Sequence, residues 1–180
     1  MNSSAHGDFR VDSEVDVYGI LGALVRHEVD FVVIGGIAVA RHGFVRGTKD
    51  VDIVPNPAHG NLTKLVAALQ ELEAEPLARQ DFRRDELPLK RTVESLALGG
   101  NWDLSTRRGR LDVMQYIEGA LETPEDYNRL RRDAVISDLE VGAVPIAGYE
   151  DLLDLKQLAG RDVDLMDIRA LREARRDTAP

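Results

Sequence analysis

The chain has 180 residues, of which 43% are apolar, and a formal net charge of −9 at pH 7. Its length suits one domain with one sizeable core, and its apolar content argues against wholesale disorder. The negative charge argues against a protein that coats nucleic acid, which needs a dense basic face, and the absence of cysteine excludes disulfides and thiolate metal sites.

The N-terminal stretch MNSSAHGDFRVDSE is polar and has no apolar segment typical of a secretory signal. No apolar run in the sequence approaches the roughly 18 to 20 residues of a membrane-spanning helix. We therefore expect a cytoplasmic protein that does not contact a membrane, with residues 1–10 disordered. Apolar residues at helical spacing then predict a helix within residues 12–29, capped by Asp12 or Ser13.

The next segments alternate between strand and helix patterns. A β-branched run at residues 31–34 predicts a buried strand that ends at a glycine pair, and residues 37–43 predict a short helix. Residues 49–55 alternate polar and apolar side chains, which predicts a strand with one face in water. Leucines and valines at helical spacing predict an amphipathic helix over residues 61–75.

The second half of the chain predicts shorter elements. They are a charged loop at residues 79–90, strands at 92–100, 101–106 and 110–117, a helix at 123–133, strands on either side of Gly142, and two helices within 149–176 that meet near Gly160. The expected fold class is mixed α/β (α+β), with a small mixed β-sheet flanked by helices. Residues 11–147 would form the core, and residues 148–180 a short helical segment packed on it.

Three aspartates on predicted strands are candidates for a metal site. Asp50 and Asp52 point to the same face of one strand, roughly 6–7 Å apart, and Asp112 lies within a later apolar strand. Carboxylates placed together repel each other, and Mg²⁺ binds one or two carboxylates together with phosphate oxygens. If the two strands are neighbours, the three residues can hold one or two metal ions. The alternative is a strand with an exposed acidic face.

The glycine pair Gly35-Gly36 follows an apolar strand and precedes a helix. Backbone N–H groups at such a place can approach a phosphate closely, although a plain tight turn is the alternative. The pair matches neither the glycine fingerprint of dinucleotide-binding folds nor a P-loop.

Together these residues resemble the signature of the DNA polymerase β-like nucleotidyltransferase superfamily. That signature is an apolar residue, Gly, Gly or Ser, a spacer, Asp-apolar-Asp or Glu, and a third carboxylate on a later strand. Here thirteen residues separate Gly36 from Asp50, and Asp112 follows on a later strand. The stretch RHGFVRGTKDVDIV and the tail YEDLLDLKQLAGRDVDLMDI more narrowly resemble minimal nucleotidyltransferases of the AbiEii and MenT toxin type.

The resemblance implies a nucleotidyltransferase fold and an enzyme that uses Mg²⁺ to transfer a nucleoside monophosphate from a nucleoside triphosphate to an acceptor hydroxyl, releasing pyrophosphate. At the toxin level it implies RNA, the 3′ end of tRNA, as acceptor and a cognate antitoxin as partner. Gly36 stands where many relatives have Ser, so a hydroxyl contact to the triphosphate is missing. The implied site comprises the metal ligands and catalytic carboxylates Asp50, Asp52 and Asp112, the catalytic Lys156, and the nucleotide-binding Gly35, Gly36, Arg46, Thr48 and Lys49.

Several polar side chains also have simpler interpretations, in which they serve the fold alone. Arg46 could form an ion pair with Asp50 or Asp52, and Lys156 could be a helix lysine that reaches solvent. Asp164 and Asp167 could form ion pairs with Arg161 or Arg169. His42 could cap a helix or pack, and Trp102 could lie in the core.

Two other functions stay open beside transfer to RNA. One is nucleotidylation of a small molecule, such as an aminoglycoside or lincosamide, or of a protein hydroxyl. The other is a catalytically idle protein that only binds a nucleotide or a partner. Arginine clusters at residues 79–91, 107–110 and 129–132 keep RNA open despite the negative charge. An RNA enzyme should depend steeply on salt and on Arg83-Arg84 or Arg107-Arg108, whereas a small-molecule enzyme should not.

Overall fold

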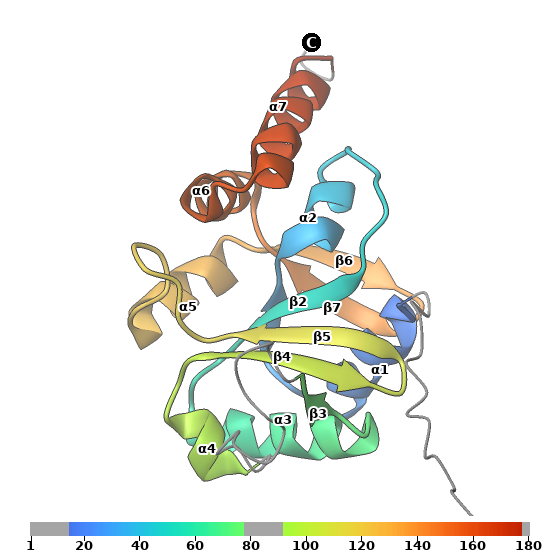
Figure 1. The fold of residues 1–180 in the computed structure, drawn as a ribbon, viewed down its shortest axis with the longest axis vertical. Helices are drawn as coiled ribbons and strands as arrows, with labels where there is room; N and C mark the ends of the chain where they lie inside the picture. Colours follow the sequence, from blue (N-terminus) through green and yellow to red (C-terminus); the bar gives the residue numbers. More distant parts are fainter. Residues whose placement is uncertain (1–14, 78–91, 178–180) are drawn as a thin grey trace, which may run out of the picture.

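The computed structural model describes residues 15–77 and 92–177, and these build a seven-stranded mixed sheet. Its strands are β1 (Phe31–Val33), β2 (Asp50–Pro55), β3 (Glu75–Pro76), β4 (Asn101–Thr106), β5 (Gly109–Met114), β6 (Val135–Leu139) and β7 (Gly142–Ile146). They lie in the order β3-β4-β5-β2-β1-β7-β6 (Figure 1). The pairs β1–β7 and β2–β5 are parallel, and the other neighbours are antiparallel. The expected mixed α/β fold class is confirmed.

The helices of the described residues are α1 (Val17–Arg26), α2 (Gly35–Arg41), α3 (His59–Glu71), α4 (Val93–Ala97), α5 (Pro124–Arg132), α6 (Tyr149–Ala159) and α7 (Asp162–Asp177). Figure 1 shows α6 and α7 beside α2 at one end of the molecule, with α3 and α4 at the opposite end. Among the helices seen in residues 15–77 and 92–177, none combines the length and the apolar character that crossing a bilayer requires.

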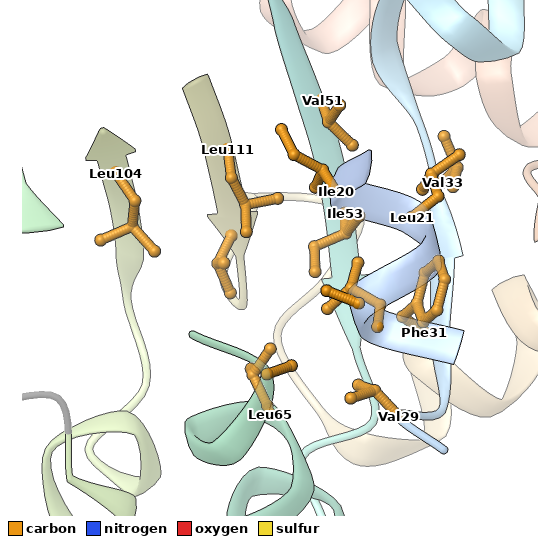
Figure 2. Close-up of a cluster of buried hydrophobic side chains, with 14 of the residues drawn as sticks. Ile20, Leu21, Val29, Phe31, Val33, Val51, Ile53, Leu65, Leu104 and Leu111 are labelled. Carbon is orange, nitrogen blue, oxygen red and sulfur yellow. The ribbon is translucent and has the colours of Figure 1, made fainter. Parts of the chain in front are cut away.

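The larger core lies on the sheet face that α1 and α3 cover. Period-two alternation directs Val51 and Ile53 of β2 and Leu111 of β5 to this face, where they meet Ile20 and Leu65 of the two helices (Figure 2). All five side chains are fully buried. Because Val51 and Ile53 point into this core, the aspartates between and beside them must point to the other face.

A second, smaller core lies on the opposite face, under α5 and α6. Val32 and Val54 contribute from the sheet, Tyr127 and Leu130 from α5, and Leu155 from α6. The aspartates of β2 and β5 lie beside this cluster, since Ile34, Met114 and Leu155 line the same cavity as the aspartates.

The predicted elements agree with the structure except at four places. The helix expected over residues 61–75 ends at Glu71, and the short strand β3 that follows it was not predicted. Residues 92–100 were expected as a strand from their β-branched start, and this is wrong: the segment contains α4. The Thr92 hydroxyl accepts a hydrogen bond from the backbone N–H of Ser95 (3.2 Å), which caps the helix, and only Leu96 is buried. A strand with one buried face would bury every second residue, whereas residues 92–100 bury only Leu96, as a short helix does.

The other two differences concern helix starts. Asp16, rather than Asp12 or Ser13, caps α1 by accepting a hydrogen bond from the N–H of Gly19 (2.8 Å). Helix α2 begins at Gly35, so both glycines belong to its first turn rather than to a turn before it. The predicted disordered tail at 1–10 and the predicted loop at 79–90 lie outside the described residues.

The predicted break between the last two helices is confirmed at Gly160. This residue has φ 61° and ends α6 in the left-handed conformation, for which glycine pays no steric cost. Helix α7 begins two residues later and folds back on α6. The reversal brings acidic residues of α7 against a lysine of α6, close to the end of the sheet that carries the aspartates.

Candidate active site

The three predicted carboxylates lie together because β2 and β5 are parallel neighbours. Asp52 is paired in register with Asp112, and Asp50 stands two residues earlier on the same face of β2. One carboxylate oxygen from each residue lies within 4.8 Å of one from each of the others. The condition that the sequence left open, that the two strands be neighbours, is therefore met.

Gly35 fits directly beneath this group. A Cβ at residue 35 would come within 1.9 Å of Asp52 Oδ2, and the residue has φ 65°. The backbone N–H of Ile34 donates to the Asp52 carbonyl (3.0 Å), which fixes the strand against the start of α2. A residue with a side chain at position 35 would displace the Asp52 carboxylate, so the glycine is required by the site as well as by the turn.

The carboxylates are electrostatically strained without a cation. Burial raises the pKa of Asp52 to about 6, and the charge of Asp50 adds to the effect against the opposing charges of Lys156, Arg161 and Arg110. Burial also raises the pKa of Asp112 to about 7, and the nearby Asp52 and Asp103 add to the effect against Arg110. A divalent cation would remove both penalties.

The donor set fits Mg²⁺. It consists only of carboxylate oxygens, which hard cations prefer. In addition, Asp112 Oδ1 is buried and has no hydrogen-bond partner among the described residues. Buried polar atoms are normally satisfied, so this oxygen is a candidate metal ligand.

The loop before β2 holds the second group of predicted residues. The Thr48 hydroxyl donates to the Asp50 carbonyl (2.9 Å). It also lies 2.8 Å from the place where a Cβ on Gly36 would stand. Thr48 thus occupies the space that a side chain at position 36 would need, which accounts for glycine there. Lys49 lines the same cavity as the carboxylates.

Lys156 is not a solvent-reaching lysine; it is buried in an ion-pair network. Its Nζ lies 2.7 Å from Asp164 Oδ1 and 3.0 Å from Asp167 Oδ2, and both aspartates are fully buried. Arg161 donates to Asp164, with Nε 2.7 Å from Oδ2. Arg46 donates to both oxygens of Asp167, at 2.7 and 2.8 Å. The alternative pairing of Arg46 with Asp50 or Asp52 does not occur.

Burial alone would raise the pKa of Asp164 and of Asp167. Hydrogen bonds from Arg161 and Lys156 to Asp164, and from Arg46 and Lys156 to Asp167, outweigh burial and hold both pKa values below the usual range. Two carboxylates and three cations leave this network with a net positive charge, next to three carboxylates of the candidate metal site.

A cavity of about 890 Å³ joins the two groups. On one side it is lined by the start of α2, the loop before β2 and the network on α6 and α7. On the other side it is lined by β4, β5 and the chain after β5, including Asp103, Tyr116 and Glu118. The cavity is therefore wide enough for more than a metal ion, and both acidic and basic side chains line it.

The described arginines of the sequence clusters 107–110 and 129–132 are bound to acidic residues of the chain. The pairs are Arg107–Glu73, Arg108–Asp16, Arg110–Asp112, Arg129–Asp151, Arg131–Asp30 and Arg132–Asp133. Only Arg110 among them lines the cavity. Arg83, Arg84 and the rest of the first cluster lie outside the described residues. The other five pair with acidic side chains outside the cavity.

The two remaining candidates serve the fold. The His42 ring lies 2.8 Å from the Ala147 carbonyl, through Nε2, and edge-on to Tyr149. It ends α2 and packs, as its simpler interpretation predicted. Trp102 is 5% exposed and belongs to the larger core, as expected.

Sequence reasoning did not single out three residues of the cavity as site residues: Asp103, Arg110 and Arg161. Asp103 is opposite Asp112 in the β4–β5 register, which follows only from strand pairing. Arg161 had a detectable signal, since it directly follows the helix-ending glycine at the predicted break.

No protein-family model and no curated protein sequence matches the chain. Solved structures do. The chain is similar to lincosamide antibiotic adenylyltransferase LnuA, bound to lincomycin, with 17% identity, TM-score 0.58, and 90% of this chain and 99% of that one covered. It is similar to ANT(2")-Ia in complex with adenylyl-2"-tobramycin, with 13% identity, TM-score 0.51, and 86% and 84% covered.

A third similar structure is an antigenic nucleotidyltransferase-like protein from Paracoccidioides brasiliensis, with 19% identity, TM-score 0.51, and 86% of this chain and 73% of that one covered. At these identities the likeness concerns the fold. The chain has the nucleotidyltransferase fold that its glycine pair and strand aspartates predicted.

Proposed function

We propose that the protein is a Mg²⁺-dependent nucleotidyltransferase that moves a nucleoside monophosphate from a nucleoside triphosphate to an acceptor hydroxyl. The observation that carries this proposal is the convergence of Asp50, Asp52 and Asp112 within 4.8 Å, above a glycine at the start of a helix. The orphaned Asp112 oxygen and the raised pKa values of two of the carboxylates support a metal at this place.

In this proposal the three aspartates hold one or two Mg²⁺ ions. When bound, such ions neutralise charge on the triphosphate and stabilise the departing pyrophosphate. The chain supplies position and charge. Thr48 fixes the backbone at Asp50, Gly35 leaves room for the Asp52 carboxylate, and the N–H groups of Gly35 and Gly36 face the phosphates. Asp112 also accepts the proton of the acceptor hydroxyl.

The cations of the proposed nucleotide side differ in how they act. Lys49 lines the cavity and would contact a phosphate. Arg46 and Lys156 are held by buried carboxylates, so we assign them a fixed positive charge beside the metal site. Fixed charges of this kind stabilise developing negative charge without reorganisation.

The acceptor remains a proposal with two candidates. Toxin-type transfer to the 3′ end of tRNA, with a cognate antitoxin as partner, rests on the sequence resemblance. Transfer to a small molecule is favoured by the charge of the structure. Five described arginines of the sequence clusters lie outside the cavity and are paired with acidic residues, and the cavity lining includes Asp103 and Glu118. A polyanion gains little from such a surface. We place the small hydroxyl compound first.

A transfer assay tests the proposal. The protein is incubated with Mg²⁺ and each labelled nucleoside triphosphate, together with total RNA, RNase-treated extract, or a panel of hydroxylated amines and antibiotics. The control is Asp52→Asn, with Asp138→Asn as an exposed strand aspartate far from the site. Label on a small compound supports the first acceptor, and label on tRNA-sized RNA reverses the order. If none of the acceptors receives label in a way that depends on Asp52, the enzyme proposal is contradicted.

A further inference from the structure

Arg161 occupies a place that differs from those of the other cations in the network. It directly follows Gly160, the left-handed residue that ends α6, and directly precedes α7. Its backbone N–H (3.3 Å) and its Nε (2.7 Å) both point to Asp164 Oδ2, and Nη2 lies 3.3 Å from Oδ1. Both ends of the residue are therefore fixed by one buried carboxylate.

Each nitrogen of the Arg46 guanidinium and the Nζ of Lys156 already has a partner among the described residues. Arg46 uses Nε and Nη2 for Asp167 and Nη1 for the Gly47 carbonyl (3.0 Å). Lys156 is 6% exposed and lies between two carboxylates. Neither residue can turn to a ligand without leaving a buried aspartate with fewer partners, which is costly.

Arg161 has donors left. Its side chain is 70% exposed and lines the cavity, and among the residues the structure describes no acceptor faces its Nη1. Asp50, Asp52 and Asp112 line the same cavity as Arg161. A guanidinium held on one edge and open on the other is suited to bind a phosphate, because it presents N–H donors in a rigid plane.

We propose that Arg161 binds the terminal phosphates of the nucleoside triphosphate, and then the pyrophosphate that leaves, and that Asp164 and Lys156 position it. Lys156 acts through Asp164: its Nζ holds Oδ1 of the carboxylate that binds one edge of the guanidinium, and the other edge stays open. This inference rests on the proposed nucleotidyl transfer and adds a residue that contacts the leaving group. The simpler alternative is that Arg161 only stabilises the start of α7.

Calorimetric titration distinguishes a phosphate-binding Arg161 from a purely structural one. The ligands are inorganic pyrophosphate with Mg²⁺, the four nucleoside triphosphates and the four nucleoside monophosphates. The variants are Arg161→Ala, Arg161→Lys and Asp164→Asn. Arg169→Ala is the matched control, because Arg169 is exposed on α7, the helix that follows Arg161, and does not line the cavity. Thermal unfolding of each variant shows that it is folded at the temperature of the titration.

Arg161→Ala should weaken pyrophosphate and triphosphate binding about 10-fold to 100-fold, the range for a lost charge-assisted hydrogen bond, and leave monophosphate binding unchanged. Arg161→Lys should recover part of the loss, and Arg169→Ala should bind as the wild type does. As a single variant, Asp164→Asn should weaken pyrophosphate binding. In the Arg161→Ala background it should cause no further loss, because a positioning residue acts only through the residue that it positions.

Three results would overturn the inference. If wild type binds pyrophosphate and Arg161→Ala binds it equally well, Arg161 is structural and the proposed function is untouched. If Arg161→Ala and Asp164→Asn lose affinity additively, Asp164 does not act through Arg161. If the wild-type protein binds neither pyrophosphate nor any triphosphate with Mg²⁺, the proposed function fails as well.

Discussion

Replacing Asp52 with Asn should stabilise the metal-free protein while abolishing its function. Burial and the neighbouring Asp50 raise the pKa of Asp52 from 3.8 to about 6. Because the pKa is higher in the folded state, the folded protein resists ionisation of this group, and stability falls as the pH rises from about 4 through about 6. A rise of this size corresponds to about 3 kcal/mol, at about 1.4 kcal/mol for each pKa unit. Asn keeps the shape of the side chain without the charge.

The free energy of unfolding should therefore be higher in Asp52→Asn than in wild type by up to about 3 kcal/mol at pH 8, and nearly equal at pH 4. Urea unfolding at the two pH values, in the presence of a chelator, measures the difference. Asp138→Asn, an exposed substitution on β6, is the control.

Adding Mg²⁺ at pH 8 should reverse the order. The ion stabilises wild type because it binds only the folded state, and it should have little effect on Asp52→Asn. The reasoning is refuted if Asp52→Asn is no more stable than wild type at pH 8 without metal, or if Mg²⁺ stabilises both proteins equally.

Three other predictions concern the glycine, the third carboxylate and the buried lysine. Gly35→Ala should abolish stabilisation by Mg²⁺ and lower the free energy of unfolding by at least about 1–2 kcal/mol, because residue 35 has φ 65° and its Cβ would come within 1.9 Å of Asp52 Oδ2. Gly47→Ala is the control: its Cβ would meet open space, so it should change neither the stability nor the effect of Mg²⁺. Thermal melts with and without Mg²⁺ measure both variants. Asp112→Asn should lose nucleotidyl transfer in the label assay and weaken Mg²⁺ binding in titration calorimetry; equal Mg²⁺ affinity would exclude Asp112 as a ligand. Lys156→Met should lower the free energy of unfolding, measured in urea, by about 3–5 kcal/mol, because it leaves the buried Asp164 and Asp167 each short of a partner. Lys64→Met removes a solvent-exposed ion pair with Glu28 and should cost less than about 1 kcal/mol. Equal losses in the two variants would contradict a role of burial.

Local patterns in the sequence were enough to identify the elements that carry the site. The alternation of Asp50 and Asp52 with Val51 and Ile53 is a period of two, which only a strand with one buried face explains. The glycine after Ala159 ended a helix as expected. The failure at α4 has a physical reason: Thr92 and Val93 favour a strand, but the Thr92 hydroxyl can also cap a helix, and tertiary burial of Leu96 decides between the two.

By itself, the sequence determined which carboxylates share a strand face and that the last two helices break at Gly160, because both follow from steric rules that act over a few residues. Only the tertiary structure decided that β5 pairs with β2 and so brings Asp112 to Asp52. It also decided that Lys156 is buried between Asp164 and Asp167, leaving Arg161 with donors open to the cavity. The partners in an ion pair depend on which elements the fold brings together. Arg46 and Asp167 are 121 residues apart in the chain, so their contact leaves no local pattern in the sequence.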